Sequence, residues 1–156
     1  MTPLGKALLA GAAAGAAGTT ALNMATYLDM AVRGRPASST PEDTIDRVTK
    51  AIGVDIPGKG DAHQNRLSGL GALSGLATGV GIGALGGLFA TKVRLPVPVL
   101  SVAVGTAAMV GSNAPMTVLG VTDPRTWDVT SWISDIIPHL AYGVVTAAVV
   151  TSLIDG

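Results

Sequence analysis

The sequence has no cysteine and very few charged or aromatic residues. Of its 156 residues, 13% are charged and 3% are aromatic, and histidine occurs twice. The absence of cysteine excludes disulfides, thiolate metal sites and cysteine nucleophiles. The formal net charge is zero and no basic cluster stands out, so no nucleic acid is expected as a partner. A soluble domain usually carries about 25% charged residues, and the shortage here indicates a single transmembrane domain over residues 1–156.

Hydrophobic residues take the place of the missing charge. They make up 48% of the chain, and the mean hydropathy is positive. A membrane span needs about 20 apolar residues, and four segments are long enough. We therefore expect an all-α, integral membrane four-helix bundle with spans at residues 4–32, 67–91, 97–121 and 132–154.

The first span begins like a secretory signal peptide, because Lys6 precedes an alanine-rich core. Its apolar character continues through Leu22 and Leu28, well beyond the region where a signal peptidase would cut. We therefore expect a retained helix. Near the end of this helix, Asp29 and Arg33 are one turn apart in the favourable order, with the acid first, and this spacing predicts an interfacial ion pair.

Glycine recurs every four residues in the second span. The stripe consists of Gly71, Gly75, Gly79, Gly83 and Gly87. Each glycine lowers helix stability in water by about 0.5–1 kcal/mol relative to alanine, whereas in lipid a glycine stripe lets another backbone approach closely. Gly11 and Gly15 form a similar small-residue surface in the first span. We therefore expect the first and second spans to pack on each other.

Most of the charge lies in the polar loop of residues 33–66. Within this loop, Thr40 has the properties of an N-cap. Ile45, Val48 and Ile52 would share one face of a short amphipathic helix that follows it. Such a helix either caps the bundle at the membrane surface or docks a partner, and the sequence leaves both alternatives open.

Lysine and arginine are unevenly distributed between the two ends of the expected bundle. Seven of the ten fall in the first and third connections or at their edges, whereas the opposite side holds Lys6, Lys92 and Arg94. Cytoplasmic loops carry an excess of these residues. The distribution therefore predicts that the loop of residues 33–66 is cytoplasmic and that both termini lie outside.

The third span is interrupted by polar residues and a proline. Pro115 removes the hydrogen bond to the carbonyl of Gly111, which Ser112 or Asn113 would then satisfy. We expect a kink here, or a break into two half-helices. Broken helices line substrate or ion sites in transporters, but prolines also occur in membrane helices for packing alone, so both interpretations stay open.

The fourth span carries the main candidate functional residues. Asp135, His139 and Tyr142 lie on one helical face, and Asn23 and Asn113 are candidates to join them in a central polar network. A carboxylate one turn from an imidazole can bind a ligand or shuttle a proton. The alternative is that these groups only hydrogen-bond across the bundle. Two ligands one turn apart do not make a metal site, so neither a metal nor a cofactor is expected.

A family resemblance rests on the first and last spans. The four spans, the glycine-rich first span with Asn23, and the run His139-Leu140-Ala141-Tyr142-Gly143 resemble the small uncharacterised inner-membrane proteins of the YagU type. The similarity covers most of the chain except the long loop. It implies a protein of the bacterial plasma membrane, in a family linked to acid tolerance, and it supplies no catalytic residue.

Three classes of function follow from these observations. The leading hypothesis is a structural or accessory subunit in the lipid bilayer, which assembles through its glycine-rich helix faces with a membrane-protein partner or as a homo-oligomer. The second is a small proton-linked transporter or channel that works as an oligomer and uses the polar face of the last span. The third is an enzyme that uses the same face. Because the sequence lacks H-E-x-x-H, G-x-S-x-G and P-loop motifs, we expect no enzyme.

Overall fold

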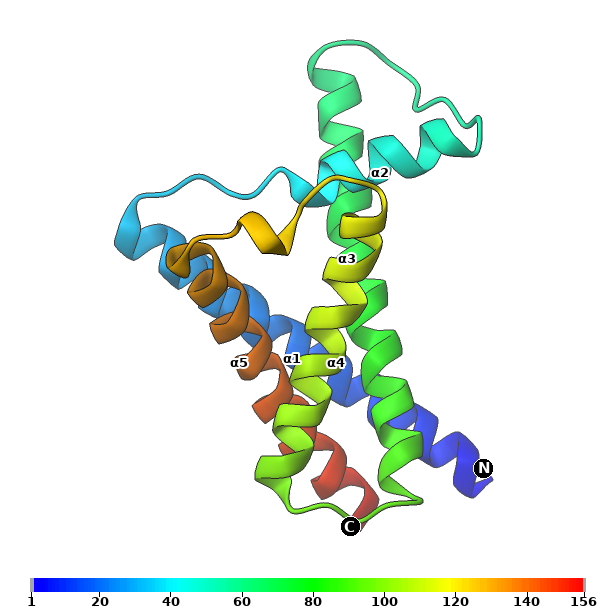
Figure 1. The fold of residues 1–156 in the computed structure, drawn as a ribbon. Helices are drawn as coiled ribbons and strands as arrows, with labels where there is room; N and C mark the ends of the chain where they lie inside the picture. Colours follow the sequence, from blue (N-terminus) through cyan, green and yellow to red (C-terminus); the bar gives the residue numbers. More distant parts are fainter. Residues whose placement is uncertain (1, 156) are drawn as a thin grey trace.

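The computed structural model describes residues 2–155, which form five α-helices and one short 3-10 helix. In chain order these are α1 (Pro3–Arg33), α2 (Thr40–Ala51), α3 (Asp61–Ala90), α4 (Val97–Val118), η1 (Pro124–Thr126) and α5 (Val129–Asp155) (Figure 1). This range contains no strand, and the predicted all-α class is confirmed. Helices α1, α3, α4 and α5 are each long and apolar enough to cross a membrane, as expected of a multi-pass membrane protein.

The predicted span boundaries differ from the helix ends at two places in particular. Helix α3 begins at Asp61 rather than at residue 67, because its polar first turns continue the helix beyond the apolar segment. Gly60, with a φ of 54°, turns the chain immediately before it. Helix α4 ends at Val118 rather than at residue 121, because Gly120 has a φ of 66°. A glycine in this left-handed conformation commonly ends a helix.

The short helix α2 forms in the polar loop as predicted, but it begins one residue early. Thr40 is its first helical residue, and Ser39 is the N-cap, so the assignment of Thr40 as N-cap was wrong. The Ser39 hydroxyl donates to the Asp43 carboxylate at 3.0 Å instead of capping a backbone amide. Helix α2 crosses the end of the bundle and packs against α3, where Pro41 contacts Gly71 (Figure 1).

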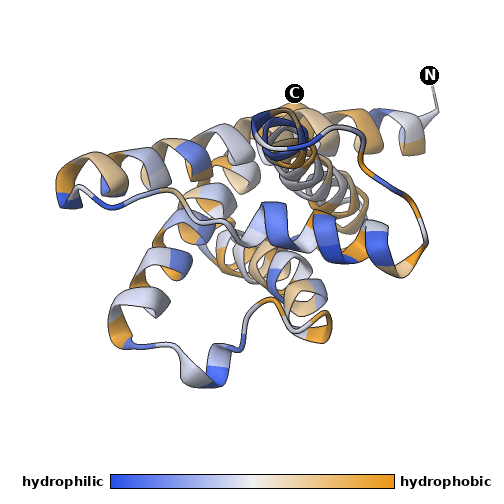
Figure 2. Cartoon of the chain, turned by 90° about the horizontal axis from the view of Figure 1, so that it is seen from above, coloured by the Kyte–Doolittle hydropathy of each residue, from blue (hydrophilic) through white to orange (hydrophobic). Residues whose placement is uncertain are grey.

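The four long helices are strongly tilted relative to one another. Helices α1 and α5 lean away from α3 and α4, and α1 crosses α3 in its N-terminal half (Figure 1). One end of the bundle, the terminus side, holds both termini and residues 91–96. The other end, the loop side, holds residues 34–60 and 119–128. Figure 2, seen from the loop side, shows hydrophilic residues gathered on α2 and the connecting segments and mostly apolar long helices.

Buried side chains are concentrated near the terminus side. We call residues 3–19, 79–90, 97–108 and 142–155 the closed half, and residues 20–33, 61–78, 109–118 and 129–141 the open half. The core of the closed half consists of Ala14, Leu100, Val104, Ala108, Tyr142, Ala147 and Val150. In the open half, the buried residues are Leu67, Gly71 and Pro138. The helices therefore pack tightly near the terminus side and diverge toward the loop side.

The crossing of α1 and α3 is a contact of backbone against backbone. A Cβ atom on Gly15 would lie 2.5 Å from the carbonyl oxygen of Gly79 and 3.0 Å from the Cα atom of Gly83. Gly11 faces Gly83 and Gly87 in the same way. The predicted packing of the first two spans is confirmed. The glycines of this crossing face each other inside the chain. Assembly with a partner through glycine-rich faces stays a prediction.

The two remaining glycines of the α3 stripe differ in what they contact. Gly71 contacts Pro41 of α2, whereas a Cβ atom on Gly75 would meet no atom within 4 Å. A second close approach, which the sequence did not reveal, joins α4 to α5, where a Cβ atom on Gly105 would lie 2.7 Å from the carbonyl oxygen of His139. Most of the glycines that lie between helices therefore allow close packing within this chain.

Candidate functional site

A polar cluster joins α4 to α5 in the open half, and it consists of Ser112, Asn113, Asp135 and His139. The Asn113 side-chain amide donates to Asp135 Oδ2 at 2.7 Å. His139 Nε2 lies 3.3 Å from Ser112 Oγ. The structure therefore brings three of the predicted site residues together and adds Ser112, which the sequence suggested only as a partner for the proline-freed carbonyl.

The His139 ring is oriented by its own helix. Nδ1 lies 2.7 Å from the Asp135 carbonyl oxygen, to which it can only donate, and 3.4 Å from Asp135 Oδ1. This geometry makes Nδ1 the donor to the Asp135 carbonyl. The Ser112 hydroxyl has one proton, which goes either to His139 Nε2 or to the Ala108 and Met109 carbonyls of its own helix. The imidazole is thus held between its own helix and α4.

Access to the polar cluster is narrow. The side chains of His139 and Asp135 are 12% and 20% exposed. A small pocket of about 40 Å³ lies between α1 and α5, with Asp29, Ser134 and Pro138 in its wall. None of the four residues of the polar cluster lines this pocket. The polar cluster is therefore held mainly by side-chain contacts between α4 and α5.

Tyr142 lies apart from the polar cluster. Its side chain is 1% exposed, and its hydroxyl donates to the carbonyl oxygen of Gly79 on α3 at 2.6 Å. The Thr146 hydroxyl, one turn further along α5, lies 3.4 Å from the Ala14 carbonyl oxygen on α1. These bonds cross the interior where the open half meets the closed half. Tyr142 therefore acts in packing, on a different level of the bundle from His139.

Asn23 is also outside the polar cluster, so the predicted link between Asn23 and the histidine face was wrong. Its side chain is exposed and has no hydrogen-bond partner within residues 2–155. Ser112 and Asn113 of α4 occupy the place expected for it. At 3.6 residues per turn, Asn23 continues the α1 face of Gly15 and Thr19, which contacts α3 in the closed half. Since α3 has diverged at this level, the face is left open at Asn23.

The predicted break in the third span is absent. Helix α4 runs without interruption to Val118, so Pro115 lies in its last turn and the prediction of two half-helices was wrong. Ser112 bonds to carbonyls one turn earlier, and Asn113 bonds to α5. Neither satisfies the carbonyl of Gly111 in the manner that the sequence suggested.

Ionic and aromatic contacts lie at the loop-side ends of α1 and α5. Asp29 binds Arg33 at 2.6 Å, as predicted, and also Arg35 at 2.5 Å. Arg33 donates in addition to Ser134 of α5 at 2.6 Å. The rings of Trp127 and Trp132 meet edge to face, with centroids 5.0 Å apart. Of these contacts, the hydrogen bond between Arg33 and Ser134 joins α1 to α5 near the expected membrane boundary.

Within residues 2–155, no three His, Asp or Glu side chains are grouped so as to hold a metal ion. A pocket of about 400 Å³ lies at the α3–α4 connection, away from the polar cluster. No family model matches the chain, and no curated protein and no solved structure is significantly similar to it.

Proposed function

We propose that this protein is a structural or accessory subunit that binds a membrane-spanning partner along the open half. The observation that carries the proposal is the exposed Asn23. It lies ten residues before Arg33, about 15 Å along α1 from the loop-side end, and its amide has no partner within residues 2–155. A polar group without a partner in hydrocarbon costs several kcal/mol. A helix of another subunit that binds this face would supply the missing hydrogen bond.

The same face has the shape that such a helix needs. In the closed half, Gly15 and Thr19 bring α1 against α3, and the face then continues through Asn23 without a covering helix. Small and polar residues at helix contacts are typical of membrane bundles, because they allow close approach and hydrogen bonding. We propose a heteromeric partner first and a second copy of this chain as the alternative.

Site-specific photo-crosslinking tests this proposal. A photoreactive amino acid is placed at Asn23, and a control is placed at Leu28, which lies about 7.5 Å nearer the loop side on a different face of α1 and is 65% exposed. The expected result in native membranes is a protein adduct from position 23 and only lipid adducts from position 28. The mass of the adduct identifies a partner or a second copy.

Two results would contradict the proposal. Lipid adducts alone at both positions would mean that lipid covers the open half. Protein adducts of equal yield at both positions would mean that crosslinking reports crowding rather than a defined interface.

A second candidate function, proton-linked transport, is supported by the polar cluster. Histidine titrates near neutral pH, and in this cluster a carboxylate oxygen lies 3.4 Å from His139 Nδ1. Ionisable groups inside membrane segments are rare and often belong to proton relays. The closed half, whose interior Tyr142 fills, would have to open for a proton or substrate to cross.

Proteoliposome flux measurements separate the two candidates. If the cluster carries protons, His139→Ala abolishes proton flux while the bundle remains folded by circular dichroism. His63→Ala is the matched control, because His63 lies at the loop side and bonds to the backbone of Ile56. Absence of flux in the unmodified protein, or equal flux in both variants, would remove the transport candidate and leave the accessory role.

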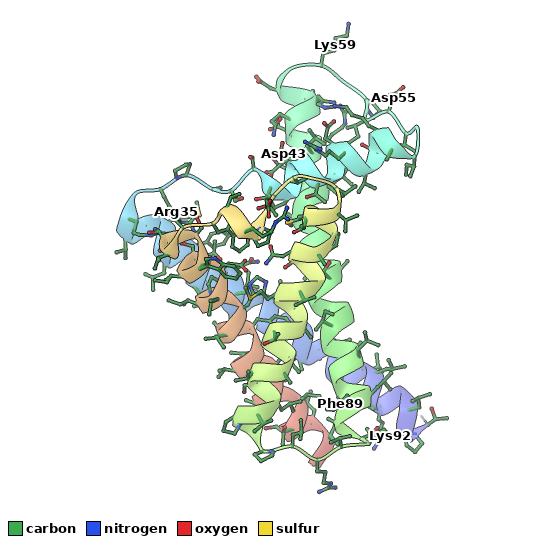
Figure 3. The ribbon with its side chains drawn as sticks, viewed as in Figure 1. Arg35, Asp43, Asp55, Lys59, Phe89 and Lys92 are labelled. Carbon is green, nitrogen blue, oxygen red and sulfur yellow. The ribbon has the colours of Figure 1, made fainter. Side chains whose placement is uncertain are left out.

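We also propose that the protein lies in a bacterial plasma membrane with its loop side in the cytoplasm. The excess of Lys and Arg at that end supports this orientation. Because the chain has no cysteine, single-cysteine labelling is free of background. We expect Asp55→Cys to react with an impermeant maleimide only after the membrane is permeabilised and Lys92→Cys to react in intact cells; Figure 3 shows these residues at opposite ends. The reverse pattern would invert the orientation.

A further inference from the structure

A pocket of about 400 Å³ opens on the terminus side, where the α3–α4 connection passes the end of α5. Its wall includes the polar residues Thr91, Arg94 and Thr151 and the apolar residues Leu95, Leu100 and Ile154. It therefore combines an apolar surface with one cation at the end of the membrane-spanning helices. A phospholipid presents the complementary combination, an anionic headgroup above an acyl chain, at the same depth.

The cations around this pocket differ from those of the loop side. The terminus side holds Lys6, Lys92 and Arg94, and Asp155 is its one acidic residue in the sequence; Lys92 is labelled at this end in Figure 3. None of the three cations forms an ion pair with any residue whose side chain is described, whereas four loop-side cations are paired with aspartates. Among the side chains that the structure describes, no carboxylate therefore neutralises Arg94 at the pocket.

Helix α4 begins beside the pocket and adds to this preference. Its first turn contains no acidic residue, and its N-cap, Pro96, provides no capping side chain. The helix dipole places partial positive charge at this end. Leu95 and Leu100, on either side of the start of α4, line the pocket, so the positive end of the helix dipole lies beside it. The dipole and the Arg94 guanidinium therefore both favour an anion in the pocket.

We propose that this pocket binds an anionic phospholipid. The Arg94 guanidinium pairs with the phosphate, the Thr151 hydroxyl donates to it, and the apolar wall contacts the upper part of an acyl chain. A soluble phosphate would use the cation alone and would leave Leu95, Leu100 and Ile154 in contact with water. The apolar wall therefore favours a lipid over a free anion. This site goes beyond the proposed accessory role and is independent of the open half.

Native mass spectrometry of the purified protein in non-ionic detergent tests the proposal. Phosphatidylglycerol and phosphatidylcholine with identical acyl chains are added in equal amounts. We expect retention of phosphatidylglycerol to exceed that of phosphatidylcholine about fivefold, which corresponds to the attraction of one basic residue near a membrane surface. Inorganic phosphate at the same concentration should not displace the lipid. The readout is bound lipid, so failure here leaves the partner proposal untouched.

Three variants assign the effect to the pocket. Arg94→Gln should abolish the preference, and Arg94→Lys should restore most of it. Lys6→Gln removes a cation of the same end that is not part of the pocket wall, and it should retain the preference. Equal retention of the two lipids, an unchanged preference in Arg94→Gln, or displacement by phosphate would each overturn the proposal.

A fourth variant covers the case in which Arg94→Gln does not fold. Val93 lines the pocket and is 41% exposed, so Val93→Trp should fill the space without disturbing the core. Loss of bound phosphatidylglycerol in Val93→Trp would support the site, and full retention would overturn it.

Discussion

Replacing Gly83 with alanine tests the backbone contact between α1 and α3. The new Cβ atom would lie 2.5 Å from the carbonyl oxygen of Gly11 and 2.6 Å from the amide nitrogen of Gly15. Ordinary contacts of a Cβ atom begin near 3.4 Å. Both neighbours are backbone atoms that cannot rotate away, so the two helices would have to separate by about 1 Å at the crossing.

The expected magnitude combines two opposing effects. Overpacking of this kind costs about 1–3 kcal/mol, and alanine regains about 0.5–1 kcal/mol of helix propensity over glycine. Gly83→Ala should therefore lower the free energy of unfolding by about 1 kcal/mol at the middle of both ranges, and by up to about 2.5 kcal/mol. Gly75→Ala, on the same helix, is the matched control, because its Cβ atom would meet nothing within 4 Å. This control should be neutral or stabilising by up to about 1 kcal/mol.

Unfolding by sodium dodecyl sulfate in mixed micelles, followed by circular dichroism, measures both variants under one set of conditions. The reasoning predicts a clear separation of the two transitions, with Gly83→Ala unfolding first. Equal transitions for Gly83→Ala and Gly75→Ala would refute it, because the stripe would then have no packing role at the crossing.

Three further predictions concern single polar contacts. Tyr142→Phe removes the buried bond to the Gly79 carbonyl and should lower the unfolding free energy by about 1 kcal/mol in the same assay; no change would mean that the ring alone holds this position. Asn113→Ala breaks the bond to Asp135 and should lower the free energy of unfolding by about 0.6–1.7 kcal/mol. Asp135→Asn should lower it by a similar amount, and the double variant should be no less stable than either single variant, because both changes remove the same bond. The side-chain hydrogen bond from Arg125 lowers the pKa of Asp123 below its ordinary value. The ionised Asp123 carboxylate therefore contributes fully to the stability of this loop above that ordinary pKa, and the contribution is lost as the pH falls through the lowered pKa. Acid titration of tryptophan fluorescence should show this loss, and Asp123→Asn should remove it.

The sequence predicted the four spans and the α1–α3 contact because both depend on local composition. Hydropathy identifies a membrane span, and a spacing of four residues places glycines on one face. Helix ends were less predictable. The polar residues after Asp61 continue α3 outside the expected membrane, where hydropathy carries no information. Gly120 ends α4 through a conformation that its sequence context did not reveal.

The partners of the polar residues depended on how the helices tilt, which no local pattern encodes. Asn113 and Asp135 are brought together because α4 and α5 pack closely at Gly105. Asn23 was expected at the same place, but α1 and α3 diverge on the loop side and leave it exposed. Tyr142 shares a face with His139 and nevertheless bonds to α3, because it lies one level deeper in the bundle.

The mass of the intact particle, extracted from native membranes in mild detergent, tests the accessory role most directly. The chain alone weighs 15.5 kDa. We expect the unmodified protein to carry a stoichiometric partner or a second copy, and Asn23→Leu, which alters only an exposed side chain, to lose it while remaining folded. A particle of 15.5 kDa plus lipid in the unmodified protein, or an Asn23→Leu particle of unchanged mass, would contradict the account.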